Sequence, residues 1–203
     1  MRRAAIGTLL GAMLALGLAC GPAAAQMLRQ GSLLDNFVAH DQNGAAVTLQ
    51  GLGRTPTNVQ GQGGRPRIVV LAFVSFDCNP CDQVNVGWTT LLSKWDMAKF
   101  DYGFAQLLVF GKGRKPSTQD DAKAWAKASS VPTRTVIAET TQKDIERLVS
   151  LRGFNFANYP VFVIVGTDQR VQTVLGRGTT FDDLDKAVRA TQPKRGLGGV
   201  MGR

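Results

Sequence analysis

Two nearby cysteines, in the motif Cys78-Asn79-Pro80-Cys81, constrain the fold of this chain more than any other feature. The motif follows an apolar run, Ile68 to Val74, and opens an amphipathic stretch, so it lies where a buried strand gives way to a helix. At a helix N-terminus, unpaired N–H groups and the helix dipole favour the thiolate form of Cys78, and Cys81 is within disulfide reach. The pattern therefore predicts a redox-active pair.

A structural zinc site and simple core packing are the other interpretations of the pair. A closed zinc site needs four ligands, and outside the motif the chain offers only His40 and Cys20 as imidazole or thiolate donors. Carboxylates could complete such a site. The scarcity of better ligands disfavours zinc, and no metal or other cofactor is predicted.

Residues 1–25 have the three-part layout of an export signal. Arg2 and Arg3 form the positive n-region, Ile6 to Ala19 the apolar h-region, and Ala23-Ala24-Ala25 a small-residue cleavage site. We therefore expect an exported protein, in a compartment that permits disulfides.

Membrane anchoring is the alternative to cleavage. The apolar run could remain as an uncleaved signal anchor, although it is short and rich in Gly and Ala. Alternatively, Leu18-Ala19-Cys20-Gly21 resembles a bacterial lipoprotein signal in which Cys20 is lipidated, with Gly17 where that pattern usually has Leu. Cleavage after Ala25 fits the sequence better than either.

The rest of the chain is predicted to form one domain, residues 26–190, followed by a disordered, basic, Gly-rich tail, residues 191–203. The formal net charge of +9 falls to about +7 without the signal, because Arg2 and Arg3 leave with it. This charge favours contact with anionic lipid or an acidic partner. Nucleic acid is disfavoured because the basic residues are spread along an exported chain. We expect a monomer.

The first half reads as a hairpin, an irregular loop, a buried strand and a helix. Asn43-Gly44 between apolar runs predicts a hairpin over residues 37–49, and residues 51–67 have the composition of an exposed connection. The strand at residues 68–74 is apolar without alternation, as in a strand buried on both faces. Apolar residues at helical spacing predict a helix from about Pro80 to Trp95.

Strands and helices alternate again in the second half, which suggests crossovers in an open sheet. The predicted strands are residues 104–110, 135–138, 161–165 and 171–175. The predicted helices cover residues 120–129, a stretch opened by a capping box at residues 141–144, and a last helix starting near Thr180. Gly111 to Lys115 lacks the spacing of a phosphate-binding loop and is interpreted as a solvated turn. The three tryptophans are expected in the core: Trp88, Trp95 and Trp125.

The order of elements and three motifs resemble a thioredoxin-fold family, the exported TlpA-like or redoxin (AhpC/TSA-related) thiol-disulfide oxidoreductases. The motifs are the N-terminal hairpin, Cys-x-Pro-Cys after an apolar strand, and Tyr159-Pro160 before a strand. The likeness extends from about Leu33 to Ala190. It implies a periplasmic protein with an α/β thioredoxin-like fold: a central mixed sheet flanked by helices, with an N-terminal β-hairpin extension.

The resemblance also implies a role for each site residue. Cys78 is the nucleophile, Cys81 resolves the mixed disulfide, and Pro160 follows a cis peptide bond and faces the pair. The substrate groove is formed by the side chains next to these three: Phe76, Asn79, Pro80 and Tyr159. Phe76 suits core packing as well as it suits the rim of a groove.

Two positions depart from the thioredoxin pattern. Asp77 stands where Trp is common, and an ionised carboxylate there disfavours the neighbouring thiolate. Ala72 replaces the buried acid that thioredoxin carries six residues before the nucleophile, so the proton acceptor for Cys81 is water or another residue. Glu139 is the candidate acid, although a solvated surface side chain is the better interpretation of it.

The resemblance implies disulfide exchange with protein substrates. It favours the reducing direction, because a proline directly before the second cysteine, as at Pro80, is shared with reducing members of the fold. A pair kept reduced in an oxidising compartment would imply an electron donor at the membrane. Three alternatives stay open: a thioredoxin-fold peroxidase, a copper-handling assembly factor, and a binding module with a structural disulfide. Apart from the cysteine itself, this chain keeps only the hydroxyl of the peroxidase motif Pro-x-x-x-Thr-x-x-Cys, as Ser75. The copper factors have three residues between their cysteines and a distal histidine, whereas this chain has two residues between its cysteines and His40 before them.

Overall fold

The centre of the molecule is strand β3 (Ile68–Ser75), which ends just before the cysteine motif. A computed structural model describes residues 30–34, 36–55, 64–129, 135–138 and 159–192 of the chain. β3 pairs in parallel with β4 (Tyr102–Phe110) and antiparallel with β6 (Val161–Val165). All eight residues of β3 are buried, as expected for an apolar strand covered on both faces.

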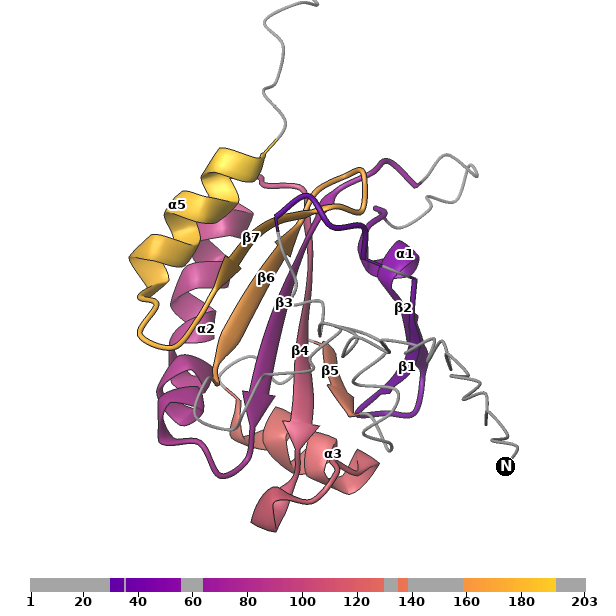
Figure 1. Ribbon diagram of the computed structural model, residues 1–203, viewed down its shortest axis with the longest axis vertical. Helices are drawn as coiled ribbons and strands as arrows, with labels where there is room; N and C mark the ends of the chain where they lie inside the picture. The colour runs from indigo at the N-terminus through magenta and orange to yellow at the C-terminus, as the bar shows by residue number, and fades with distance from the viewer. Residues whose placement is uncertain (1–29, 35, 56–63, 130–134, 139–158, 193–203) are drawn as a thin grey trace, which may run out of the picture.

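The described strands form one mixed sheet in the order β2-β1-β5-β4-β3-β6-β7 (Figure 1). The N-terminal hairpin of β1 (Val38–Asp41) and β2 (Ala46–Thr48) joins this sheet through β5 (Thr135–Ala138), which runs parallel to β4. The Asp41 carboxylate accepts hydrogen bonds from the N–H groups of Asn43 and Ala45, and Gly44 has a φ of 81°. The Asn-Gly sequence thus makes the expected turn.

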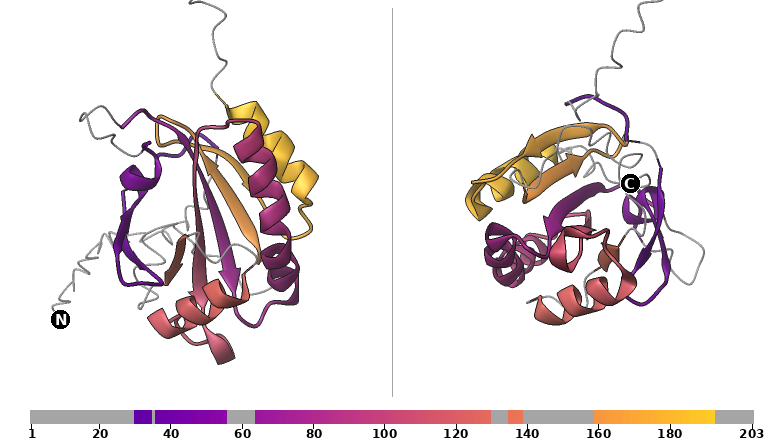
Figure 2. Two further views of the ribbon diagram at one scale, coloured as in Figure 1. Left: turned by 180° about the vertical axis from the view of Figure 1, so that it is seen from behind. Right: turned by 60° about the horizontal axis from the view of Figure 1, so that its bottom comes forward.

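Helices α2 (Asn79–Met97) and α5 (Phe181–Thr191) cover one face of the sheet, next to β3, β6 and β7 (Val171–Leu175) (Figure 2). Three side chains of β3 pack against these helices: Ile68, Val70 and Ala72. Trp88 and Trp95 of α2 are fully buried there, as predicted. Thr180 and Asp183 form a reciprocal capping box that starts α5.

Helix α3 (Gln119–Ala128) follows β4 and carries Trp125, which is also buried. The odd-numbered β3 side chains belong to a second core cluster, together with α3 and the N-terminal segment. This confirms the predicted α/β fold: a central mixed sheet, flanking helices and an N-terminal hairpin.

The prediction of an exposed connection over residues 51–67 is wrong for its first residues. Residues Leu49–Leu52 form a short helix, α1, and the hairpin strand ends one residue earlier than expected. Thr48 caps this helix through its hydroxyl, and Leu49 and Leu52 are both buried. Their apolar side chains are packed in the core, which a Gly-rich composition did not indicate.

Several predicted features lie outside the described residues: the export signal at 1–25, the helix opening at 141–144, Glu139, and the basic tail beyond residue 192. Within the part of the chain that is described, no helix is both long and apolar enough to cross a bilayer.

Candidate functional site

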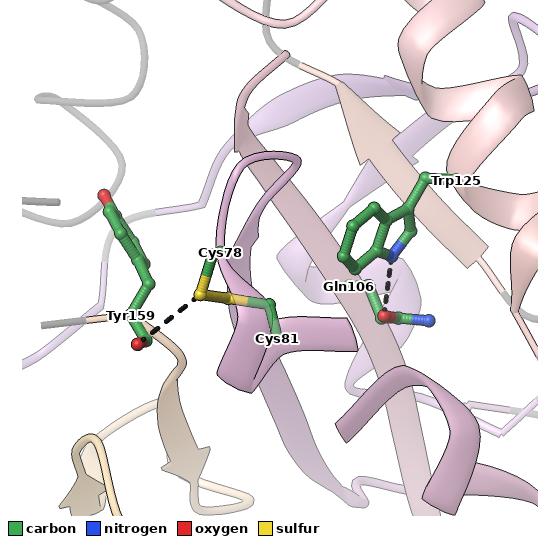
Figure 3. Close-up of a disulfide and its surroundings, with 5 residues drawn as sticks. All are labelled: Cys78, Cys81, Gln106, Trp125 and Tyr159. Atoms are coloured by element: carbon green, nitrogen blue, oxygen red, sulfur yellow. Dashed lines mark hydrogen bonds between the residues drawn. A yellow bond between two sulfur atoms is a disulfide. The ribbon is translucent and has the colours of Figure 1, made fainter. Parts of the chain in front are cut away.

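Cys78 and Cys81 form a disulfide at the start of α2, with their Cα atoms 5.2 Å apart (Figure 3). Cys78 is the N-cap residue and has an extended backbone, whereas Cys81 lies within the first turn of the helix. The Cys81 N–H donates to the Cys78 carbonyl over 2.8 Å, and Pro80 occupies an early position where no N–H is needed. The sequence Asn-Pro between the cysteines therefore starts the helix and closes the pair.

The two cysteines differ in accessibility. Cys81 has no exposed surface, whereas Cys78 retains 6%. Of the residues between them, Asn79 is exposed and Pro80 is half-buried. A partner that approaches over Asn79 therefore meets the Cys78 side of the disulfide, since Cys81 is covered.

The Tyr159-Pro160 peptide bond is cis and lies against the disulfide. The carbonyl oxygen of Tyr159 is 3.6 Å from Cys78 Sγ (Figure 3). The oxidised sulfur carries no proton, so this is a polar contact; a reduced Cys78 thiol in the same place could donate to the carbonyl. Burial raises the pKa of the Tyr159 phenol to about 12, so this side chain is neutral at physiological pH.

Asp77 is tied to the loop after β4. Its Oδ2 accepts hydrogen bonds from the N–H groups of Gly113 (2.8 Å) and Arg114 (3.2 Å). These residues belong to a short 3-10 turn, η1 (Lys112–Arg114). The carboxylate before Cys78 thus has backbone partners that the sequence did not indicate.

Phe76 is half-buried and packs beside the cysteine motif. Its ring meets that of Trp125 edge-on at 5.4 Å, and Lys112 Nζ lies 5.4 Å from its centroid. The rings of Phe110 and Tyr159 are 6.2 Å apart. Phe76 therefore has the packing contacts expected of it, and its place in a substrate groove stays a prediction.

Gln106 is a buried polar residue that sequence reasoning missed. It is the register partner of Ala72, the position at which thioredoxin has its buried acid, and both residues are fully buried. Gln106 Oε1 accepts a hydrogen bond from Trp125 Nε1 over 3.0 Å, and Nε2 has no partner within the described residues (Figure 3). The sequence signal that could have identified Gln106 is a single amide side chain within the otherwise apolar strand Phe104 to Phe110.

The structure thus places Cys78, Cys81, Tyr159 and Pro160 together, with Phe76 close in sequence on the strand-to-helix connection. The catalytic and groove roles assigned to these residues stay predictions. His40 is exposed on β1, and the described residues contain no group of three or more His, Cys, Asp or Glu side chains that could hold a metal ion.

Comparisons with known proteins identify the fold. No protein-family model matches the sequence, and no curated protein matches it. Among solved structures, a thioredoxin-family thiol:disulfide interchange protein from Chlorobium tepidum TLS has a TM-score of 0.57 and 14% identity, covering 80% of this chain and 97% of that chain.

Two further structures show how widely this fold is used. Peroxidoxin BcpB from Mycobacterium tuberculosis has a TM-score of 0.60 and 14% identity, with 82% of this chain and 99% of that chain covered. BsSco, of the Sco family of cytochrome c oxidase assembly proteins, has a TM-score of 0.58 and 17% identity, with 82% and 97% covered. At such identities the likeness is one of fold. The chain is a thioredoxin-fold protein with a Cys-x-x-Cys disulfide.

Proposed function

We propose that the protein is an exported thiol-disulfide oxidoreductase that reduces disulfides in protein substrates. The observation that carries the proposal is the asymmetric disulfide at a helix N-terminus. Cys78 lies beside the carbonyl of Tyr159, the residue before cis-Pro160, whereas Cys81 is covered. Export rests on the sequence of residues 1–25, including the alternative of an anchor at Cys20.

The proposed reaction starts from the reduced pair. The Cys78 thiolate attacks one sulfur of a partner disulfide, forming a mixed disulfide and releasing the partner's other sulfur as a thiolate, which takes up a proton. Cys81 then loses its proton and attacks Cys78 Sγ, so that the Cys78–Cys81 disulfide forms and the second partner sulfur leaves as a thiolate. Two electrons pass from the pair to the partner. An external dithiol donor must then restore the pair.

Pro160 suits the mixed-disulfide step because it has no N–H to direct at the sulfurs. The backbone of Tyr159 can pair with an extended partner segment, as its carbonyl already faces Cys78.

The direction of exchange is argued from the groups around Cys78. A strong oxidant needs a well-stabilised reduced form. The helix N-terminus favours a Cys78 thiolate, but the Tyr159 carbonyl, 3.6 Å from Cys78 Sγ, is an acceptor that disfavours negative charge on sulfur. This balance favours a reductase.

The test is to trap the intermediate. A Cys81→Ser variant cannot complete the second attack, so it should accumulate covalent complexes with exported proteins, which disappear on adding reductant. The matched control is the Cys78→Ser/Cys81→Ser double variant, which should form none. Complexes formed equally by the double variant, or none with Cys81→Ser while the wild type reduces a disulfide substrate, would contradict the proposed order of attack.

The peroxidase alternative is tested with the same variants. A peroxidase would consume hydrogen peroxide through Cys78 at a rate that does not depend on a protein disulfide. We expect the wild-type protein to reduce protein disulfides much faster than peroxide.

A further inference from the structure

We propose that the loop Gly111–Lys115, here named the basic loop, is a docking surface for an acidic segment next to the disulfide of the partner protein. The inference rests on the proposed function and adds a substrate class to it. The three basic side chains of the loop are all exposed: Lys112, Arg114 and Lys115.

The basic loop is fastened to the residues that lead into the cysteine pair. Asp77, immediately before Cys78, binds the N–H groups of Gly113 and Arg114. The Phe76 N–H donates to the Phe110 carbonyl over 3.0 Å, at the residue where the loop begins. Lys112 Nζ also lies over the Phe76 ring. Lys112 and the backbone of the basic loop therefore flank the strand-to-helix connection that precedes Cys78.

The conformation of the basic loop is fixed before any partner binds. Gly113 and Arg114 have left-handed backbones, with φ of 71° and 58°, and a non-glycine residue adopts this region only when its surroundings hold it there. The Asp77 carboxylate supplies that constraint. At the base of the loop, the Gly111 N–H donates to the Lys115 carbonyl over 2.9 Å. A preformed surface loses less entropy when a partner docks.

In the part of the chain that the structure describes, the basic loop adds exposed positive charge to this side of the site. Asp77 and Asp121 lie against the loop backbone, and both carboxylates accept backbone N–H groups, Asp121 from Thr118, the N-cap residue of α3. Lys112 and Lys115 are exposed beside these two occupied carboxylates, near the half-buried rings of Phe76 and Phe110. The matching partner segment is extended and carries Asp or Glu close to its cysteine, since complementary charge speeds encounter and selects among partners.

The test compares cyclic disulfide peptides that differ only in whether the residues flanking the disulfide are Glu, Gln or Lys. Single-turnover reduction by the reduced wild-type protein should be fastest for the Glu peptide, by about three- to tenfold over the Gln peptide at low salt. The preference should disappear in about 1 M salt, where the screening length is about 3 Å. The Lys112→Gln/Lys115→Gln variant should lose the preference for the Glu peptide over the Gln peptide.

A matched control removes the same charge elsewhere. Lys127 on α3 and Lys186 on α5 are both exposed, and the Lys127→Gln/Lys186→Gln variant should keep the wild-type preference. An equal loss in this control, or no preference in the wild type, would overturn the proposal. So would a Lys112→Gln/Lys115→Gln variant that slows all three peptides equally, because the loop would then act on the thiolate and not on the partner.

Binding without chemistry separates this inference from the proposed function. A fluorescent Glu-rich peptide lacking cysteine should bind the oxidised wild-type protein, and binding should weaken by about three- to tenfold in Lys112→Gln/Lys115→Gln but not in the control variant. Failure to reduce any peptide, together with this binding pattern, would sink the reductase proposal alone. Absence of the binding difference overturns the docking surface. Equal binding of anionic lipid vesicles and of the peptide would show a non-selective anion surface and also overturn it.

Discussion

At the scale of single residues, Gly103 marks the closest approach between β4 and the backbone of α1. A Cβ at this position would lie 2.0 Å from the Leu52 carbonyl oxygen and 2.8 Å from its carbon. Backbone atoms cannot rotate away as a side chain can, so α1 or β4 must move to remove the clash with an added Cβ. The buried side chains of Leu49 and Leu52 hold α1 in place.

Gly103→Ala should therefore lower the free energy of unfolding by about 2–3 kcal/mol, the range for overpacking that forces backbone shifts. Urea denaturation of the reference and variant proteins measures this. Gly176→Ala is the control, because a Cβ there meets nothing within 4 Å, and it should change stability by no more than about 0.5 kcal/mol. A neutral Gly103→Ala would mean that α1 can move to admit the added methyl group at no cost in stability.

Residue-level prediction from the sequence succeeded where chemistry is local and failed where it depends on strand register. The cysteine pair and the buried tryptophans follow from a short motif and from helical spacing, and the cis bond before Pro160 was implied by the family resemblance. Gln106 lies beside Ala72 only because β3 and β4 pair in one particular register. The contact of Asp77 with the basic loop likewise joins segments more than thirty residues apart.

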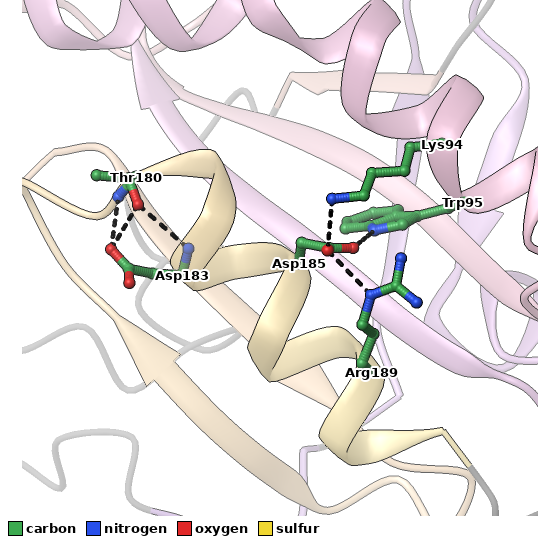
Figure 4. A network of polar contacts seen from close by, with 6 residues as sticks. All are labelled: Lys94, Trp95, Thr180, Asp183, Asp185 and Arg189. Atoms are coloured by element: carbon green, nitrogen blue, oxygen red, sulfur yellow. Dashed lines mark hydrogen bonds and ion pairs between the residues drawn. The ribbon is translucent and has the colours of Figure 1, made fainter.

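At the scale of elements, a buried carboxylate joins α2 to α5 (Figure 4). Asp185 of α5 accepts hydrogen bonds from Trp95 Nε1 (2.9 Å) and Arg189 Nε (2.9 Å), and Lys94 Nζ is 2.8 Å from its Oδ2. Burial is the largest single influence on its pKa and raises it, but the bonds from Arg189, Lys94 and Trp95 together outweigh burial. The net effect is a pKa of Asp185 below its usual value.

Asp185→Asn should lower the free energy of unfolding by about 2 kcal/mol at neutral pH, because the two half-exposed cations and the indole lose a charged acceptor. A lowered folded-state pKa means that this stabilisation is complete above the unfolded pKa of about 4 and is lost as the pH falls through the folded value. The difference in unfolding free energy between the wild type and Asp185→Asn should therefore become smaller as the pH falls below about 4. Urea titrations across this pH range measure it.

The control is Asp182→Asn, which changes an exposed residue in the first turn of the same helix. It should cost about 0.5 kcal/mol through the helix dipole. Equal losses for the two variants would mean that the Asp185 contacts contribute little to holding α5 against α2.

The elements that the sequence predicted best are those with strong local signals. The Asn-Gly turn, the Thr180 capping box and the apolar strand β3 each correspond to described elements. Helix α1 was missed because four residues are too few to show a helical period, and its stability comes from packing Leu49 and Leu52. The basic loop was interpreted as a solvated turn, since its link to Asp77 is a tertiary contact.

At the scale of the whole molecule, the fold could be predicted but does not by itself decide the chemistry. Similar structures include a thiol:disulfide interchange protein, a peroxidoxin and a Sco protein. Beyond the fold, the structure shows the local environment of the sulfurs, in which Cys81 is covered and the Tyr159 carbonyl faces Cys78. These features act on the redox equilibrium, which couples to the stability of the entire domain.

Folding and reduction form a closed thermodynamic cycle. The oxidised and reduced proteins differ in unfolding free energy by an amount set by the difference between the reduction potentials of the unfolded and folded pairs. For two electrons, a potential difference of 30 mV corresponds to about 1.4 kcal/mol. A reductase has a folded pair of low potential, so its oxidised form is the more stable one. In a strong oxidant, the reduced form is the more stable.

We therefore expect the oxidised protein to resist urea better than the protein reduced with excess dithiol, by at least about 1.4 kcal/mol. The physical reason is that reduction places a thiol or thiolate against the Tyr159 carbonyl, which disfavours charge on Cys78, and leaves Cys81 covered, where burial disfavours its thiolate. The Cys78→Ser/Cys81→Ser variant, treated with and without dithiol, controls for effects of the reductant. A reduced form more stable than the oxidised form would reverse the direction of exchange, since the same pair would then act as an oxidant of its partners.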